Sequence, residues 1–276
     1  MDYYRKIGDI LGSGGVDYAI IPVGDPRYEN DDKTTVTTVG SGDGDGLVFN
    51  YSKNRQTWDE PTTYDGRGNI PDQPFDGTDE EIDTDDAAFW TRGNGTADSV
   101  FSWGLWLQLS TAPSATNMLF SRLSASAGRE YYFYVNSSSK IIFTLYDNSR
   151  SGSINQSMDA ALSVGAQYFV VGTYDATEAN TGIILYKDGL VAASTAAGSS
   201  YTAMENLNTT TNVGHEKGGG SDAARFFLDG KLGGGPLGMF FAHRTLSAQD
   251  VWQLYQIGLE ARSQHSSLWL PMRRAA

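Results

Sequence analysis

The chain has 276 residues, a formal net charge of −13 and no cysteine. This length suits one large domain with extensions, and the lack of cysteine excludes disulfide bonds and thiol redox chemistry. The excess of carboxylates argues against nucleic acid or an anionic membrane surface as a partner. The 32 glycines, the many tyrosines and phenylalanines and the scarce helical periodicity predict an all-β protein of many short strands.

Residues 1–70 form a first segment, in which short apolar pieces alternate with Asp, Gly and Thr. No apolar run at the N-terminus is long enough for a signal peptide or a transmembrane helix, so we expect no membrane insertion. Tyr3, Ile20 and Trp58 belong to more apolar material than a pure linker carries. We therefore expect an ordered arm, which packs on the rest of the chain or reaches a neighbouring molecule. We also expect the following domain to fold without this arm.

The predicted strands begin after residue 70, and the stretch at 102–109 is the most informative of them. Trp103, Leu105 and Leu107 alternate to one face there, while Trp106 lies on the other. Both faces are then partly covered, as expected for a strand in two stacked antiparallel sheets. The other predicted strands are 118–122, 131–135, 140–146, 167–174, 182–187, 190–194, 226–228 and 237–242.

One predicted strand carries an aromatic run, Tyr131-Tyr132-Phe133-Tyr134. Only alternate members of such a run face the same side of a sheet. Tyr132 and Tyr134 could therefore form an outward platform on which sugar rings stack, whereas aromatic side chains in a sandwich more often fill the core. Both alternatives stay open at the level of the sequence.

Two local signals mark the second half of the chain. Asp188-Gly189 lies between two apolar runs and predicts a tight hairpin, because both residues tolerate positive φ. Ser247 is a good N-cap, and Asp250 three residues later completes a capping box. A helix is therefore predicted to begin here, with an apolar stripe that ends at Gly258 as a stop signal.

Three segments, taken in order, resemble the laminin-G-like jelly rolls of the concanavalin A-like lectin/glucanase superfamily. They are the Phe-Asp-Gly opening at 75–77, the strand and Tyr-Lys-Asp-Gly hairpin within 167–194, and the Arg-Thr-Leu-Ser helix start at 244–247. The resemblance implies a two-sheet antiparallel jelly-roll sandwich with one short C-terminal helix, and binding or scaffolding rather than catalysis. It divides the chain into an N-terminal arm at 1–70, the jelly roll at 71–262 and a C-terminal tail at 263–276.

The acidic stretch at 81–86, Glu-Ile-Asp-Thr-Asp-Asp, resembles the Glu-x-Asp-x-x-Glu motif of family-16 glucanases, which share this fold. Retaining glycosidases place their two carboxyl groups about 5–5.5 Å apart. Asp86 is one methylene shorter than the family's glutamate and would misplace the acid. The isolated histidines His215, His243 and His265 lack the spacing of zinc ligands. We therefore predict no catalytic residue and no enzyme activity.

Calcium is the one cofactor that the resemblance raises. Related domains hold it through aspartates, and Asp76, Asp79 and Asp229 could supply oxygen ligands. The closing strand lacks the acidic pair that the family usually carries there. The Asp-Gly-Asp-Gly stretch at 43–46 offers half of a calcium loop without its bidentate carboxylate. We predict no metal site, with calcium as an open alternative.

The resemblance, the arm and the tail together favour a non-catalytic structural or interaction protein. Laminin-G-like chains of this kind resemble proteins of tailed-phage virions, so we expect a virion surface protein, either a capsid decoration or a tail-associated protein. Its partners would be further copies of the chain or capsid and tail neighbours. The alternative is a lectin-like adhesion module that binds cell-surface glycans and reaches the cell exterior by a non-classical route. A family-16-like glucanase is the third alternative. The ligand-binding residues stay unassigned.

Overall fold

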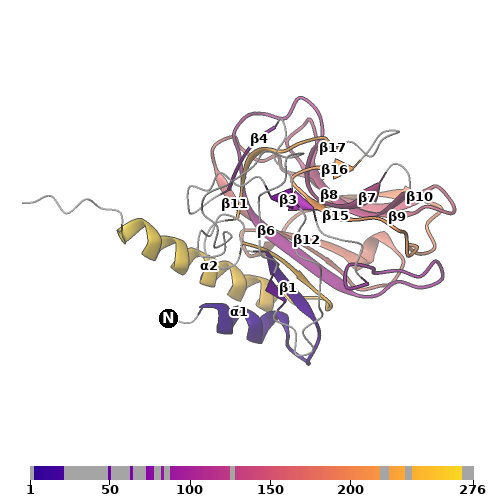
Figure 1. The fold of residues 1–276 in the computed structure, drawn as a ribbon, viewed down its shortest axis with the longest axis horizontal. Helices are drawn as coiled ribbons and strands as arrows, with labels where there is room; N and C mark the ends of the chain where they lie inside the picture. The colour runs from indigo at the N-terminus through magenta and orange to yellow at the C-terminus, as the bar shows by residue number, and fades with distance from the viewer. Residues whose placement is uncertain are drawn as a thin grey trace, which may run out of the picture.

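The structure is a computed structural model that describes residues 3–21, 49–50, 63–64, 73–77, 82–83, 88–124, 128–217, 224–233 and 238–268. Two antiparallel sheets stack face to face (Figure 1). The expected all-β sandwich is thus confirmed. None of the described helices is both long and apolar enough to cross a membrane.

The first sheet has nine strands in the described residues, with the main order β13-β12-β11-β6-β19-β1-β2. Strand β18 pairs with β6 and with β4 beside this path. The nine strands are β1 (Tyr18–Ile21), β2 (Phe49–Asn50), β4 (Gln73–Asp76), β6 (Phe101–Leu109), β11 (Gln167–Tyr174), β12 (Ile183–Lys187), β13 (Leu190–Val191), β18 (Asp229–Leu232) and β19 (Met239–Ala242).

The second sheet has eight described strands, in the order β14-β10-β9-β8-β7-β15-β5-β3. A small hairpin of β16 (Glu216–Lys217) and β17 (Ala224–Arg225) accompanies it. The eight strands are β3 (Thr63–Tyr64), β5 (Ile82–Asp83), β7 (Asn117–Ser124), β8 (Gly128–Val135), β9 (Ile141–Asp147), β10 (Gly152–Met158), β14 (Ser194–Ser199) and β15 (Thr211–Val213).

The main core fills the space between the two sheets. In β6, Trp103, Leu105 and Leu107 belong to this core, while Trp106 packs on the opposite face in a second apolar cluster. The alternation predicted from the sequence is therefore confirmed. The hairpin at Asp188-Gly189 also forms, and both residues have positive φ, 53° and 81°.

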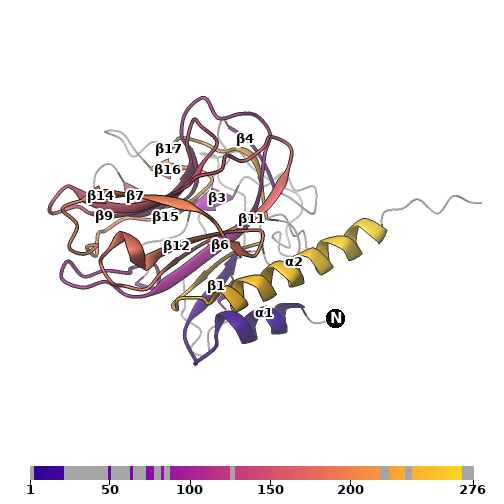
Figure 2. The same cartoon turned by 180° about the vertical axis from the view of Figure 1, so that it is seen from behind.

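Two helices, α1 (Tyr3–Leu11) and α2 (Ala248–Leu268), cover the outer face of the nine-stranded sheet. Figures 1 and 2 show them side by side against that sheet, on the side of the sandwich away from β7–β10. Ile7 of α1 and Leu254 of α2 belong to the second apolar cluster, together with Trp106. The cluster holds both helices on the sheet by burying their apolar faces.

The described part of the N-terminal arm is an integral part of the sandwich. Strand β1 pairs with β19 over four residues and with β2 on its other side, and α1 packs against α2. Of the two roles left open by the sequence, residues 3–21 therefore take the first, packing on the same chain. The expectation that the jelly roll folds without this arm conflicts with that pairing, because removing β1 would expose an edge of the sheet.

The start of α2 agrees with the sequence, but its end does not. Ser247 Oγ accepts a hydrogen bond from Asp250 N at 3.2 Å, and Asp250 Oδ2 accepts one from Ser247 N at 2.9 Å, which completes the capping box. The helix continues through Gly258 to Leu268. A Cβ at Gly258 would lie 2.7 Å from Trp106 Nε1. This glycine therefore allows close contact between helix and sheet, and it does not stop the helix.

Candidate functional site

The two outer faces of the sandwich differ. Helices cover the face of the nine-stranded sheet, whereas no described helix covers β8, β9 and β10 on the other side (Figure 1). On β8, Tyr131 and Phe133 are fully buried in the core, while Tyr132 and Tyr134 are only half-buried. The alternate members of the aromatic run thus divide as the sequence allowed, with Tyr132 and Tyr134 on the outer face.

The outward tyrosines form a stacked pair. The ring centroids of Tyr132 and Tyr134 are 5.7 Å apart, and their planes are inclined by 29°. Thr144 of β9 lies opposite Tyr132 in the sheet register. Partial burial raises the pKa of Tyr132 to about 12 and also raises the pKa of Tyr134. Both phenols therefore keep their protons at neutral pH and can donate a hydrogen bond to a ligand.

A third tyrosine and an arginine extend this surface. Tyr146 of β9 is half-buried, and the Arg129 guanidinium carbon lies 5.3 Å from the centroid of its ring. Asn155 of the neighbouring strand β10 lies opposite Thr144 in the sheet register. We call the surface formed by Arg129, Tyr132, Tyr134 and Tyr146 the tyrosine face. It offers flat aromatic rings together with hydroxyl and guanidinium donors.

A half-buried carboxylate, that of Asp98, has a structural role instead. Asp98 Oδ2 accepts hydrogen bonds from the hydroxyls of Tyr174, at 2.6 Å, and of Tyr201, while Asp98 Oδ1 accepts one from Met204 N at 2.8 Å. Burial raises the pKa of Asp98. Because the chain's own donors occupy both oxygens, the cluster ties the loop after β14 to the start of β6.

The histidines are spread over the fold, as the sequence indicates. His215 is fully buried beside β15, and only the backbone of His265 is described, in α2. His243 follows β19, and its Nε2 lies 2.8 Å from the carbonyl oxygen of Phe89, to which it donates as the Nε2–H tautomer. Burial, helped by Arg92, lowers the pKa of His243 to about 3. This imidazole is therefore neutral in the folded protein.

His243 makes the stability of the fold depend on pH. Between its pKa of about 3 in the folded state and about 6.5 in the unfolded chain, only the unfolded state binds the proton. The free energy of unfolding should therefore fall by roughly 2–3 kcal/mol as the pH decreases from 7 to 4. Urea unfolding across this range, compared between the wild type and His243→Gln, isolates the effect. Parallel pH curves for the two proteins would contradict it.

The aspartates considered for calcium are only partly described. The backbones of Asp229 and Asp76 are direct partners between β18 and β4, and Asp79 lies outside the described residues. The Asp229 carboxylate accepts a hydrogen bond from Thr111 Oγ1 at 2.5 Å. Within the described ranges, no three acidic, histidine or cysteine side chains gather closely enough to hold a metal ion. The paired backbones place Asp76 and Asp229 side by side, and the residues described around them supply no third ligand.

The acidic stretch at 81–86 is described only through the backbone of β5. This strand pairs with β15 and β3, close to one edge of the eight-stranded sheet. Glu81 and Asp86 lie outside the described residues, as does the stretch at 43–46. The described backbone thus places the stretch two strands away from β7, apart from the tyrosine face on β8 and β9.

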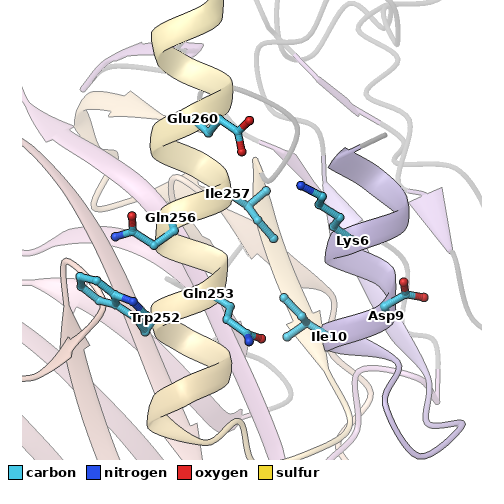
Figure 3. A pocket seen from close by; sticks show the side chains of 8 residues that line it. All are labelled: Lys6, Asp9, Ile10, Trp252, Gln253, Gln256, Ile257 and Glu260. Carbon is cyan, nitrogen blue, oxygen red and sulfur yellow. The ribbon is translucent and has the colours of Figure 1, made fainter. Parts of the chain in front are cut away.

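A groove of about 570 Å³ runs between α1 and α2 (Figure 3). Ile10 and Ile257 lie between the helices, and Trp252 lies on the far side of α2 with 42% of its surface exposed. The complete lining is Lys6, Asp9, Ile10, Trp252, Gln253, Gln256, Ile257 and Glu260. No pattern in the sequence indicates this groove, because it depends on the packing of α1 against α2.

The fold and the sequence together define the class of protein. The family model of the concanavalin A-like lectin/glucanases superfamily matches residues 76–232, more than half of the chain. The chain belongs to this superfamily. The comparison with curated proteins returns no match.

Several solved structures share the fold at low sequence identity. The binding domain of botulinum neurotoxin serotype D has a TM-score of 0.52 and 11% identity, covering 88% of this chain and 52% of that one. A botulinum neurotoxin type C structure has a TM-score of 0.51 and 12% identity, covering 92% and 52%. The binding domain of Paraclostridial Mosquitocidal Protein 1 has a TM-score of 0.52 and 10% identity, covering 75% and 49%. The chain thus spans about half the length of these structures.

Proposed function

We propose that this chain is a non-catalytic carbohydrate-binding module and that its glycan binds on the tyrosine face. The observation that carries the proposal is the stacked pair of Tyr132 and Tyr134 on a sheet face that no described helix covers. Sugar rings present apolar C–H faces and polar hydroxyls, and a protonated tyrosine matches both. The superfamily includes lectins. The solved structure of botulinum neurotoxin type C concerns cell entry through two ganglioside molecules.

Replacing Tyr134 with alanine should weaken glycan binding about tenfold, which corresponds to ~1.4 kcal/mol. The ring would be lost from the stacked pair while the core side of β8 stays intact. A glycan array followed by titration calorimetry on the full-length protein tests this expectation. Trp252→Ala, which removes an exposed aromatic ring on the opposite side of the sandwich, is the matched control. Equal affinity of wild type and Tyr134→Ala would remove the tyrosine face as the binding site.

A place in a larger assembly is a second proposal, compatible with the first. Leu190 and Val191 on the edge strand β13 are 64% and 60% exposed. Trp252 of α2 lies next to the same hairpin, 2.7 Å from a Cβ built on Gly189. Exposed apolar clusters of this kind favour protein neighbours. The virion location expected from the sequence belongs to this proposal, and mass spectrometry of purified particles would test it.

A further inference from the structure

Arg129 reaches the tyrosine face because of an irregularity in β8. Between β7 and β8, Arg122 is paired with Tyr131 while the next residue, Leu123, is paired with Arg129. Glu130 is therefore an extra residue, the mark of a β-bulge. Glu130 and Tyr131 are both fully buried, so the alternation of faces restarts after them. The bulge thus puts the exposed Arg129 on the same face as Tyr132.

The position of Arg129 is consistent with ligand binding. Its guanidinium stacks over Tyr146, which holds the planar group and leaves its edge N–H donors free to bind an anion. The neighbouring Glu130 cannot neutralise it, because the Glu130 carboxylate pairs inside the core with Arg122, at 2.9 Å between Oε2 and Nε. Within the described part of the chain, Arg129 makes no ion pair.

The charge of the surrounding surface is unusual for this chain. The whole protein has a net charge of −13, yet the residues paired with Tyr132 and Tyr134 across the sheet include no carboxylate. Tyr134 pairs with Ile142 of β9, which pairs in turn with Ser157 of β10. Tyr132 pairs with Thr144 of β9, which pairs in turn with Asn155 of β10. Asp147, at the end of β9, is almost fully buried, and its carboxylate accepts hydrogen bonds from Ser149 Oγ, Arg150 N and Thr202 N. Beside these partners of Tyr132 and Tyr134, an anionic ligand would meet the Arg129 guanidinium and no carboxylate.

We propose that the glycan bound by the tyrosine face is acidic, and that Arg129 binds its anionic group. This inference rests on the proposed carbohydrate-binding function. The guanidinium fork matches a carboxylate or a sulfate through two parallel N–H···O bonds. The phenol of Tyr132, which lies on the same face of the sheet as Arg129, can donate a further hydrogen bond to the same sugar. The tyrosines then recognise the ring, and Arg129 selects the charged member of a set of similar glycans.

Matched oligosaccharides test the selection, with one core presented in neutral, carboxylated and sulfated forms. Titration of the full-length protein at a fixed salt concentration should give affinities at least about tenfold higher for an anionic form than for the neutral one. Arg129→Gln should lower the affinity for the anionic forms to that for the neutral form and so abolish this preference. Arg129→Lys keeps the charge without the planar fork and should restore it only in part. Lys231→Gln, on the exposed side of β18, controls for the change in net charge.

The results separate the preference for an anionic glycan, the role of Arg129 and the carbohydrate-binding function itself. Equal affinity of the wild type for neutral and anionic forms would overturn the inference and leave the carbohydrate-binding function standing. A preference that survives in Arg129→Gln would overturn the role of Arg129. If the wild type binds none of the three forms while its melting temperature shows a folded protein, the proposed function fails, and the inference fails with it. The carboxylated and sulfated arms identify which anion the site prefers.

Discussion

Deleting residues 2–21 is expected to abolish cooperative folding of the sandwich. The deletion removes α1 and β1, and with them the fully buried Ile7 and Leu11. Loss of such a side chain from a core costs about 2–5 kcal/mol, and a whole domain is stable by only about 5–15 kcal/mol. The deletion also leaves β19 without one of its two partner strands and removes Ile7 and Leu11 from the second apolar cluster, to which Phe240 belongs.

Circular dichroism melting and urea unfolding of the shortened chain would measure this effect. The single variant Leu11→Ala should lower the free energy of unfolding by about 2–5 kcal/mol. Asp9→Ala, on the exposed side of the same helix, is the control and should change it little. A shortened protein that melts cooperatively near the wild-type temperature would show that the N-terminal arm is dispensable after all.

Breaking the buried ion pair between Arg122 and Glu130 is expected to have the second largest effect. Both side chains are fully buried. Glu130 Oε1 also accepts a hydrogen bond from Leu207 N at 2.9 Å, and Arg122 Nη2 donates to Thr91 Oγ1 at 3.1 Å. Glu130→Gln would leave the Arg122 charge buried without its counter-ion, which costs about 3–5 kcal/mol.

A double-mutant cycle separates the pair from its surroundings. Arg122→Met should cost as much as Glu130→Gln, and the double variant should recover part of the loss because no unpaired charge remains. Arg150→Gln is the control, because the exposed Arg150 lies 3.9 Å from Asp147, a pair expected to contribute about 0–1 kcal/mol. Additive losses in the double variant would show that the two charges act independently.

Much of the fold could be predicted from local patterns. The two faces of β6, the hairpin at Asp188-Gly189 and the capping box at Ser247 all follow from residues that lie close together in the sequence. Strands with few apolar residues escaped prediction. β10 (GSINQSM) and β14 (STAAGS) consist mostly of small or polar residues. They are strands because they pair with each other along six residues, which their composition does not indicate.

The expected helix stop at Gly258 was wrong, and the pairing of the N-terminal arm could not be predicted, for a related reason. A glycine near the end of an apolar stripe is a common stop signal, and only the indole of Trp106 beneath it explains why a glycine stands here inside a continuing helix. The pairing of β1 with β19 joins segments more than 200 residues apart, which no local pattern can indicate.

One part of the candidate site could be predicted from the sequence, and another part could not. The outward position of Tyr132 and Tyr134 follows from simple alternation, and the sequence already suggested it. Strict alternation along the strand would place Arg129 on the core side, together with Tyr131. The bulge at Glu130 inserts one extra residue and so moves Arg129 to the outer face. A charged residue at an apparent core position is the signal that could have indicated the bulge.

The helix pair has a practical consequence for the way this module can be presented. α1 begins at Tyr3 and α2 ends at Leu268, and both lie on the outer face of the nine-stranded sheet, across the sandwich from the tyrosine face. A purification tag, a fusion partner or a sensor chip joined where α1 begins or where α2 ends is therefore attached on the side away from β8, which carries Tyr134. Immobilised in this way, the protein would display the tyrosine face to the surrounding solution.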